Sequence, residues 1–184
     1  MPRAGLDTNR VVAEGVALAE EIGVDAVTLA AVAARLGVKV PSLYKHVDGM
    51  DALQGRIAAH ARGQLTEALE AHADGGLLEL ASGFRSWALA HPGLYPATMR
   101  ASRSDDTEDE ATGDRAIATF LTVLHRLGIE DERAIDATRT LRALVHGYIA
   151  LEAAGGFGLP RDVASSFHRA ITAFERSLAD WPAA

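Results

Sequence analysis

The residues best suited to bind a polyanion lie at positions 39–46, KVPSLYKH. Lysine ammonium groups and a tyrosine hydroxyl bind phosphate oxygens, whereas serine and histidine side chains can reach base edges. The stretch 28–47 holds three basic residues and no acidic one, although the chain has a formal net charge of −7. Residues 1–63 are neutral in sum, so the rest of the chain carries the whole negative charge. This unevenness indicates that the N-terminal part approaches a polyanion that the remainder repels.

A glycine and a proline divide this stretch into two short helices. Thr28 is a good N-cap for a helix that ends at Gly37, where a tight turn needs a residue that accepts positive φ. Pro41 is tolerated in the first turn of a helix, so the second helix is expected to run from Val40 to Val47. The apolar residues that would set the angle between the two helices are Val32, Ala33, Leu36, Val38 and Leu43.

Such a pair fits a helix-turn-helix, in which the second helix enters the major groove of DNA and the N-terminus of the first can bind a phosphate. We therefore expect the exposed side of the pair to contact DNA. The predicted DNA-binding residues are Thr28, Lys39, Val40, Pro41, Ser42, Tyr44, Lys45 and His46. The spacing alone also fits a plain helical hairpin, so both interpretations stay open at this point.

The run TLAAVAARLGVKVPSLYKHV resembles the DNA-binding end of the TetR family of bacterial transcription regulators. The resemblance covers about residues 8–60 and implies DNA binding. Two departures concern Val47, where the family usually has Phe, and Met50, where the family has a lysine that often meets a phosphate. More of the phosphate contact is then left to Lys39 and Lys45. The residues that match the family pattern are Thr28, Val32, Ala33, Gly37, Val38, Leu43, Tyr44 and His46.

Apolar residues recur three and four apart along most of the chain, which predicts an all-α fold of about nine helices. We expect a helix-turn-helix domain of three helices at residues 1–47 and a linking helix at residues 48–72. Residues 73–184 are expected to form a helical bundle for regulation and dimerisation. The acidic run at residues 102–114, SRSDDTEDEATGD, lacks an apolar period and is expected to be an exposed loop.

The C-terminal part resembles the regulatory domain type named after its Trp, His and Gly, through Trp87 in FRSWALAHPGLYP and His146–Gly147 in LRALVHGYIALE. This resemblance implies a helical domain that forms dimers and often encloses a small-molecule pocket. The alternative is that the same side chains fill the core. The residues expected to line the pocket are Phe84, Trp87, Tyr95, Met99, Phe120, Leu124, Leu144, His146 and Tyr148.

A dimer is also expected on physical grounds, because one short recognition helix reads few base pairs and two related by a twofold axis read a palindrome. The last two long helices offer small and aromatic residues for a four-helix interface between two copies. The alternative is that this face packs inside its own chain. The residues predicted at the interface are Ala150, Ala153, Phe167, Ile171 and Phe174.

Several function classes are disfavoured by what the sequence lacks. The chain of 184 residues has no cysteine, which excludes disulfides and thiolate metal sites. It has no G-x-S-x-G elbow, no phosphate loop and no H-x-x-x-H spacing, so we expect no enzyme, cofactor or metal site. The N-terminus lacks a signal-peptide core and no run approaches ~18 apolar residues, which predicts a cytoplasmic protein without a membrane span.

Together these features predict a dimeric, one-component transcription regulator. The expected activity is that of a repressor, released from a palindromic operator when a small-molecule effector shifts the linking helix. The alternative is a helical ligand carrier or protein-interaction module that does not bind DNA. The two functions differ in an observable way, since DNA binding weakens steeply with salt.

Overall fold

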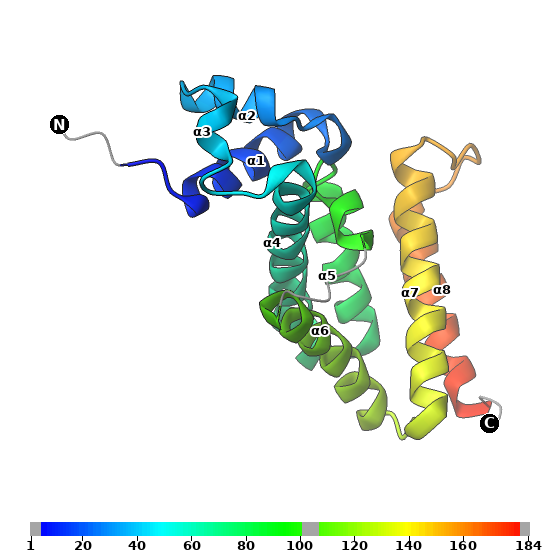
Figure 1. Ribbon diagram of the computed structural model, residues 1–184. Helices are drawn as coiled ribbons and strands as arrows, with labels where there is room; N and C mark the ends of the chain where they lie inside the picture. The colour runs from blue at the N-terminus through cyan, green and yellow to red at the C-terminus, as the bar shows by residue number, and fades with distance from the viewer. Residues whose placement is uncertain (1–4, 101–106, 181–184) are drawn as a thin grey trace. The chain divides into compact units, whose positions relative to one another are not determined.

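The computed structural model describes residues 5–100 and 107–180, and no strand occurs among them (Figure 1). The all-α prediction is confirmed. The expected count of about nine helices included a short helix near Met99, which is instead the 3-10 helix Tyr95–Met99, where the Ala97 amide donates to the Leu94 carbonyl three residues back. The eight α-helices of the described residues are α1 (Thr8–Ile22), α2 (Leu29–Leu36), α3 (Val40–Leu43), α4 (Gly49–His72), α5 (Gly76–Ala90), α6 (Thr107–Arg126), α7 (Asp131–Ala153) and α8 (Val163–Ser177).

The chain packs as two compact units. The first unit consists of Met1–Gln64 with His91–Ala111, and the second consists of Leu65–Ala90 with Thr112–Ala184. The division falls inside α4, and the segment that follows α5 returns to the unit of the N-terminal helices. The boundaries between the packed units follow residues 64, 90 and 111, whereas the predicted domain boundaries follow residues 47 and 72.

Local capping determines the first two helices. Asp7 accepts a hydrogen bond from the Arg10 amide at 2.8 Å and so caps α1, which ends at Gly23 with φ of 84°. The Thr28 hydroxyl accepts from the Ala31 amide at 3.1 Å, and α2 ends at Gly37 in the left-handed conformation. Helix α2 thus has the ends that the sequence predicts.

The recognition helix is shorter than predicted. Helix α3 covers Val40–Leu43, and the chain then continues in hydrogen-bonded turns as far as Val47. The amides of His46 and Val47 both donate to the Leu43 carbonyl, at 2.8 and 3.0 Å, so one acceptor serves two donors and the regular helical pattern stops. The predicted start of this helix at Val40 is therefore confirmed, and the predicted end at Val47 was wrong, because the helix ends at Leu43.

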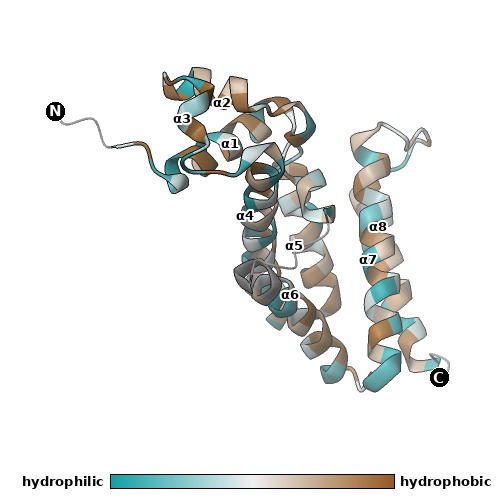
Figure 2. Cartoon of the chain, viewed as in Figure 1, coloured by the Kyte–Doolittle hydropathy of each residue, from teal (hydrophilic) through white to brown (hydrophobic). Residues whose placement is uncertain are grey.

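The first unit is held together by one buried side of each helix. Figure 2 shows polar and apolar residues along α1, α2 and α4, as expected for helices buried on one side. Val11 and Ala19 of α1 are fully buried, as are Leu53 and Ile57 of α4. A Cβ added at Gly15 would lie 3.0 Å from the Ile57 Cδ1 atom, so glycine allows close packing of α1 on α4.

The second unit is organised around α5, which packs on both α7 and α8. Arg85 of α5 makes a two-pronged ion pair with Glu152 of α7, with N–O distances of 2.6 and 2.9 Å. Its guanidinium carbon also lies 5.4 Å from the centre of the Phe167 ring of α8. One side chain therefore joins three helices.

The acidic run at residues 102–114 was expected to be a loop, and this expectation is wrong for residues 107–114, which open α6. Residues 102–106 lie outside the described residues. Acidic residues are favourable in the first turn of a helix, where the helix dipole is positive. A run of acidic residues can therefore begin a helix although it has no apolar period.

Candidate nucleic-acid interface

The recognition segment, residues 39–47, buries Leu43 and Val47 and exposes both of its lysines. Leu43 is fully buried, whereas Tyr44 is 56% exposed and Lys45 is exposed. Of the other predicted DNA-binding residues, Thr28, Lys39 and Pro41 are exposed, and Val40, Ser42 and His46 are half-buried. The predicted residues thus lie on an accessible side of one compact unit.

The angle between α2 and α3 is set by packing behind this surface. Val32 and Ala33 of α2 are buried, and α2 and α3 lie side by side (Figure 1). The Val38 amide donates to the Ala33 carbonyl at 3.0 Å, which closes the turn. Leu36 and Val38, the remaining members of the predicted apolar set, are half-buried.

A hydrogen bond from α1 secures the end of the recognition segment. The Thr8 hydroxyl donates to the His46 carbonyl at 3.2 Å. The two residues are 38 positions apart, so only the folding of the unit brings them together. No signal in the sequence assigns this role to Thr8.

The three basic residues of the stretch 28–47 have different surroundings. Arg35 binds Glu14 at 2.5 Å and Glu21 at 2.7 Å, and both glutamates lie on α1. The hydrogen bond to Glu21 raises the pKa of Arg35 above its ordinary value. Among the described residues Lys39 and Lys45 have no acidic partner, so they supply the available charge of the recognition segment.

The start of α4 offers no cation to a phosphate. Gly49 has φ of 89°, Met50 is half-buried, and Asp48 and Asp51 are exposed. Two carboxylates would oppose a phosphate there, so the departure from the family pattern at Met50 has a physical consequence. Lys39 and Lys45 are left as the basic residues of this surface.

The residues predicted to line a pocket do not form one group. Phe84, Trp87, Phe120 and Leu124 are buried in the second unit, where the Phe84 ring lies 6.5 Å from the Phe120 ring. Leu144, His146 and Tyr148 of the same unit are half-buried. Tyr95 is buried in the first unit, and Met99 of that unit is 54% exposed. Met99 is therefore a surface residue, because the 3-10 helix Tyr95–Met99 directs its last side chain outward.

His146 is neutral at physiological pH. Its ring lies edge-on to the Phe84 ring at 5.2 Å, and Arg142 Nε donates to His146 Nε2 at 3.3 Å. Burial lowers the pKa of His146 to about 4, and the positive charge of Arg142 adds to this effect. The side chain thus acts as a polar acceptor beside an aromatic cluster.

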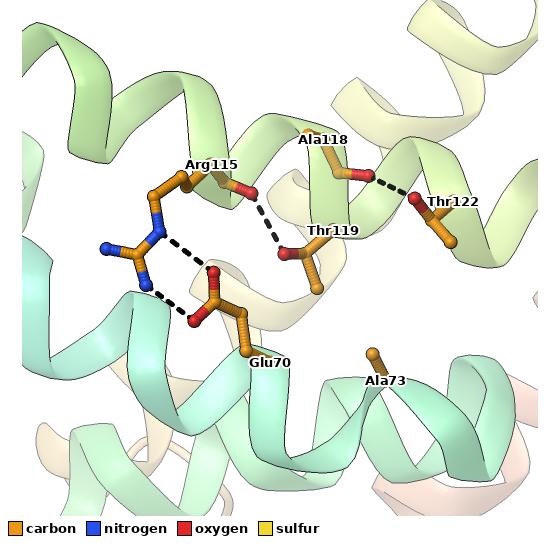
Figure 3. A pocket seen from close by; sticks show the side chains of 6 residues that line it. All are labelled: Glu70, Ala73, Arg115, Ala118, Thr119 and Thr122. Carbon is orange, nitrogen blue, oxygen red and sulfur yellow. Dashed lines mark hydrogen bonds and ion pairs between the residues drawn. The ribbon is translucent and has the colours of Figure 1, made fainter.

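An open groove of about 240 Å³ lies elsewhere in the second unit, between the end of α4 and α6. Arg115 and Glu70 point toward one another across it (Figure 3), with N–O distances of 2.6 and 3.0 Å. The hydroxyls of Thr119 and Thr122 donate to carbonyls of their own helix. None of the predicted pocket residues lines this groove, whose lining residues are Glu70, Ala73, Arg115, Ala118, Thr119 and Thr122.

The residues predicted at a dimer interface also divide into two sets. Ala150 and Ala153 of α7 are exposed. Phe167, Ile171 and Phe174 of α8 are buried within the chain, because their spacing of three and four puts them on the side that packs on α5 and α7. These three side chains belong to the core of the unit and are not available to a second copy.

No group of three or more His, Cys, Asp or Glu side chains in residues 5–100 and 107–180 has the arrangement of a metal site. Over the same residues, no helix combines the length and the apolar character that crossing a membrane requires.

Comparison with known proteins gives two matches to family models. Residues 11–57 match the model of the bacterial regulatory proteins of the tetR family. Residues 77–174, more than half of the chain, match the model of the tetracyclin repressor-like C-terminal domain.

Similar proteins agree with these matches. An uncharacterised HTH-type transcriptional regulator of Bacillus subtilis, YobS, is 31% identical over 183 residues, which are 96% of this chain and 95% of the relative. A structure from Rhodococcus sp. RHA1 is 24% identical, with a TM-score of 0.79 over 97% of this chain and 99% of that one. TetR-Q116A of Acinetobacter baumannii, solved with minocycline, is 21% identical, with a TM-score of 0.71 over 98% of this chain and 100% of that one.

A helix-turn-helix with an exposed basic segment, a helical second unit and the match of both to the models of one family lead to one conclusion. The chain belongs to the TetR family of bacterial transcription regulators.

Proposed function

We propose that this regulator is a repressor that binds a palindromic operator as a dimer and leaves it when a small molecule binds. The observation that carries the proposal is the arrangement of residues 43–45, where a buried Leu43 holds an exposed Tyr44 and Lys45 on the surface. Such a segment can enter the major groove without losing its own packing. The two lysines would bind phosphates, and Ser42 and His46 would face base edges.

The proposed dimer uses a different surface from the one expected from aromatic residues. Three small residues of α7 and the residue that caps its C-terminal end are exposed, and their spacings of four, three and four place them on one side of the helix. Gly147 is in the interior of this helix, and a Cβ added there would have no neighbour within 4 Å. Glycine inside a helix costs about 1 kcal/mol relative to alanine, and nothing in the described chain requires it. Close approach of a second copy would supply a reason for the small residues Ala143, Gly147, Ala150 and Ala154.

The proposed effector binds in the second unit. Small-molecule binding is supported by two similar structures, TetR-Q116A in complex with minocycline and the Streptomyces coelicolor protein ActR in complex with (S)-DNPA. In this chain the aromatic cluster of Phe84, Phe120 and the His146 ring offers apolar contacts to such a molecule. An effector would have to favour one of two conformations of the regulator to change its DNA affinity.

Selection of bound sequences from a random DNA library is the experiment that tests this function. We expect a palindrome whose half-sites are separated by about one or two helical turns, since two recognition segments related by a twofold axis must reach the same side of the duplex. Affinity for the selected DNA should fall steeply between low and high salt. If no sequence is enriched and no duplex is retained at low salt, the protein is a helical ligand-binding or interaction module instead.

Effector response is tested separately with the selected DNA. Compounds that raise the melting temperature of the protein should be titrated against the protein–DNA complex. A compound that stabilises the protein and releases the DNA supports a repressor with an effector. Stabilising compounds that leave the complex intact would contradict the effector part of the proposal and leave DNA binding standing.

A further inference from the structure

The segment that follows α5, residues 91–100, packs in the first unit although it lies far from the helix-turn-helix in sequence. Leu94 and Ala97 are fully buried there, and Tyr95 and Thr98 are buried to more than nine-tenths. The Arg62 guanidinium donates to the carbonyl of Arg100 at 2.9 Å. We call residues 91–100 the return segment.

The return segment is bound to the C-terminal end of α1 at three points. The His91 Nδ1 atom lies 2.5 Å from a carboxylate oxygen of Glu20. The amide of Val24, just beyond α1, donates to the Gly93 carbonyl at 3.1 Å. A Cβ added at Gly93 would overlap the carbonyl oxygen of Ala19 and lie 2.9 Å from the Glu20 Cα atom. Gly93 is therefore the residue that allows backbone to pack on backbone.

The opposite end of α1 holds the recognition segment. Thr8, the first residue of the helix, donates to the His46 carbonyl at 3.2 Å. The 15 residues between these ends form one unbroken helix. A helix of that length is a stiff rod of roughly 22 Å. A displacement of the return segment at one end of α1 would therefore be transmitted to His46 at the other.

We infer that the return segment is a positioning element of the DNA-binding unit, which sets the recognition segment through α1. This inference rests on the proposed function. The two family matches, residues 11–57 and 77–174, assign the return segment to the C-terminal domain. The packing assigns it to the helix-turn-helix unit, so the regulatory part of the chain contributes the residues that seat α1.

The first test measures amide hydrogen exchange in the full-length protein without DNA. Gly93→Ala should speed exchange at residues 40–47 by roughly fivefold or more, while amides of α7 and α8 keep their rates, because the loss is local to the first unit. Gly158→Ala is the matched control, since Gly158 is exposed and has open space around its Cα. Unchanged exchange at residues 40–47 in folded Gly93→Ala protein would overturn the inference.

A milder variant protects the test against a folding failure. His91→Ala removes the contact with Glu20 and leaves the backbone packing of Gly93 in place. It should also speed exchange at residues 40–47, by a smaller factor than Gly93→Ala. Wild-type exchange rates there in His91→Ala, together with an unfolded Gly93→Ala protein, would mean that the segment is only part of the core, and would overturn the inference.

The second test measures affinity for the selected DNA. We expect Gly93→Ala to weaken binding by roughly tenfold and Gly158→Ala to leave it unchanged, since neither residue lies on the DNA face. Wild-type affinity in Gly93→Ala would overturn the inference while the proposed function stands. Absence of DNA binding by the wild-type protein would instead refute the proposed function, and the exchange experiment would still decide whether the return segment positions residues 40–47.

Discussion

At the scale of single residues, charge on the recognition segment is decided by partners as much as by residue type. Arg35, Lys39 and Lys45 all contribute a positive charge to the sequence. Arg35 is engaged by Glu14 and Glu21, and the two lysines are exposed without an acidic partner among the described residues. A basic residue contributes to phosphate binding when its charge is not already neutralised, so the three positions should respond differently to substitution.

Lys45→Ala should weaken binding to all DNA sequences by about three- to tenfold at low salt and reduce the salt slope by ~1. Arg35→Ala is the matched comparison. It should leave the salt slope nearly unchanged, because its partners are the two glutamates, and should instead lower the melting temperature slightly. Titrations of DNA at several salt concentrations measure both slopes. Equal losses of slope in the two variants would show that Arg35 also binds phosphate.

His146 predicts a dependence of stability on pH. Its pKa is about 4 in the folded protein because burial and the charge of Arg142 disfavour the protonated ring. In the unfolded state His146 takes up a proton near pH 6.5. The contribution of His146 to the free energy of unfolding is therefore complete above pH 6.5 and is lost as the pH falls toward 4. Below pH 4 this contribution no longer changes. Between pH 6.5 and 4 the free energy of unfolding should fall by on the order of 1–2 kcal/mol on this account, a value that is reduced because the ring is partly exposed to solvent.

Chemical denaturation between pH 4 and 7.5 measures this effect, with His146→Gln as the control. The wild-type protein should lose more stability over this range than the variant does, since acidic residues affect both proteins alike. Parallel curves for the two proteins would contradict a neutral, buried His146.

At the scale of secondary-structure elements, packing between α2 and α3 determines whether the DNA face exists. Leu43 is the buried side chain of α3, and α3 packs on α2, where Val32 and Ala33 are buried. A helix of four residues is too short to be stable alone, so its conformation depends on this contact. The recognition segment is therefore sensitive to volume changes behind it.

Leu43→Ala should destabilise the protein by about 2–5 kcal/mol, as expected for a buried leucine, and should abolish specific DNA binding. Leu43→Met, which nearly conserves the volume, should cost less than about 1.5 kcal/mol and retain binding. Denaturant midpoints and DNA titrations measure the two properties. Full DNA affinity in a folded Leu43→Ala protein would mean that α3 is not the element that enters the groove.

At the scale of the whole molecule, the sequence separates a neutral N-terminal third from an acidic remainder. Such a distribution favours one orientation of approach to DNA, because the acidic part is repelled by phosphates. A twofold dimer would present two recognition segments to the same duplex. The proposed α7 surface has to bring two copies close enough for this arrangement.

Gly147→Ala separates the effect of this residue on dimerisation from its effect on the stability of α7. Within one chain it should stabilise α7 by up to about 1 kcal/mol, but it should weaken dimerisation, and Gly147→Leu should weaken it further. Gly63→Ala is the matched control, since Gly63 is also inside a helix with open space around it. Sedimentation velocity over a range of concentrations gives the dimer affinity. An unchanged dimer affinity in Gly147→Leu would show that the dimer interface does not include this side of α7.

The sequence by itself determined the features that depend on neighbours along the chain. The ends of α2 follow from Thr28 and Gly37, since a cap hydroxyl and a left-handed glycine act within a few residues. The all-α class follows from apolar spacing in the same way. The long motif at residues 28–47 predicted the helix-turn-helix family, which the comparisons established.

Only the tertiary structure decided the features that depend on residues far apart in the sequence. It paired Arg35 with two glutamates, bound Thr8 to the end of the recognition segment and buried the aromatic residues of α8 inside the chain. It also returned residues 91–100 to the first unit. Spacing tells which residues share a side of a helix, but which helix covers that side is decided by the packing of the whole unit.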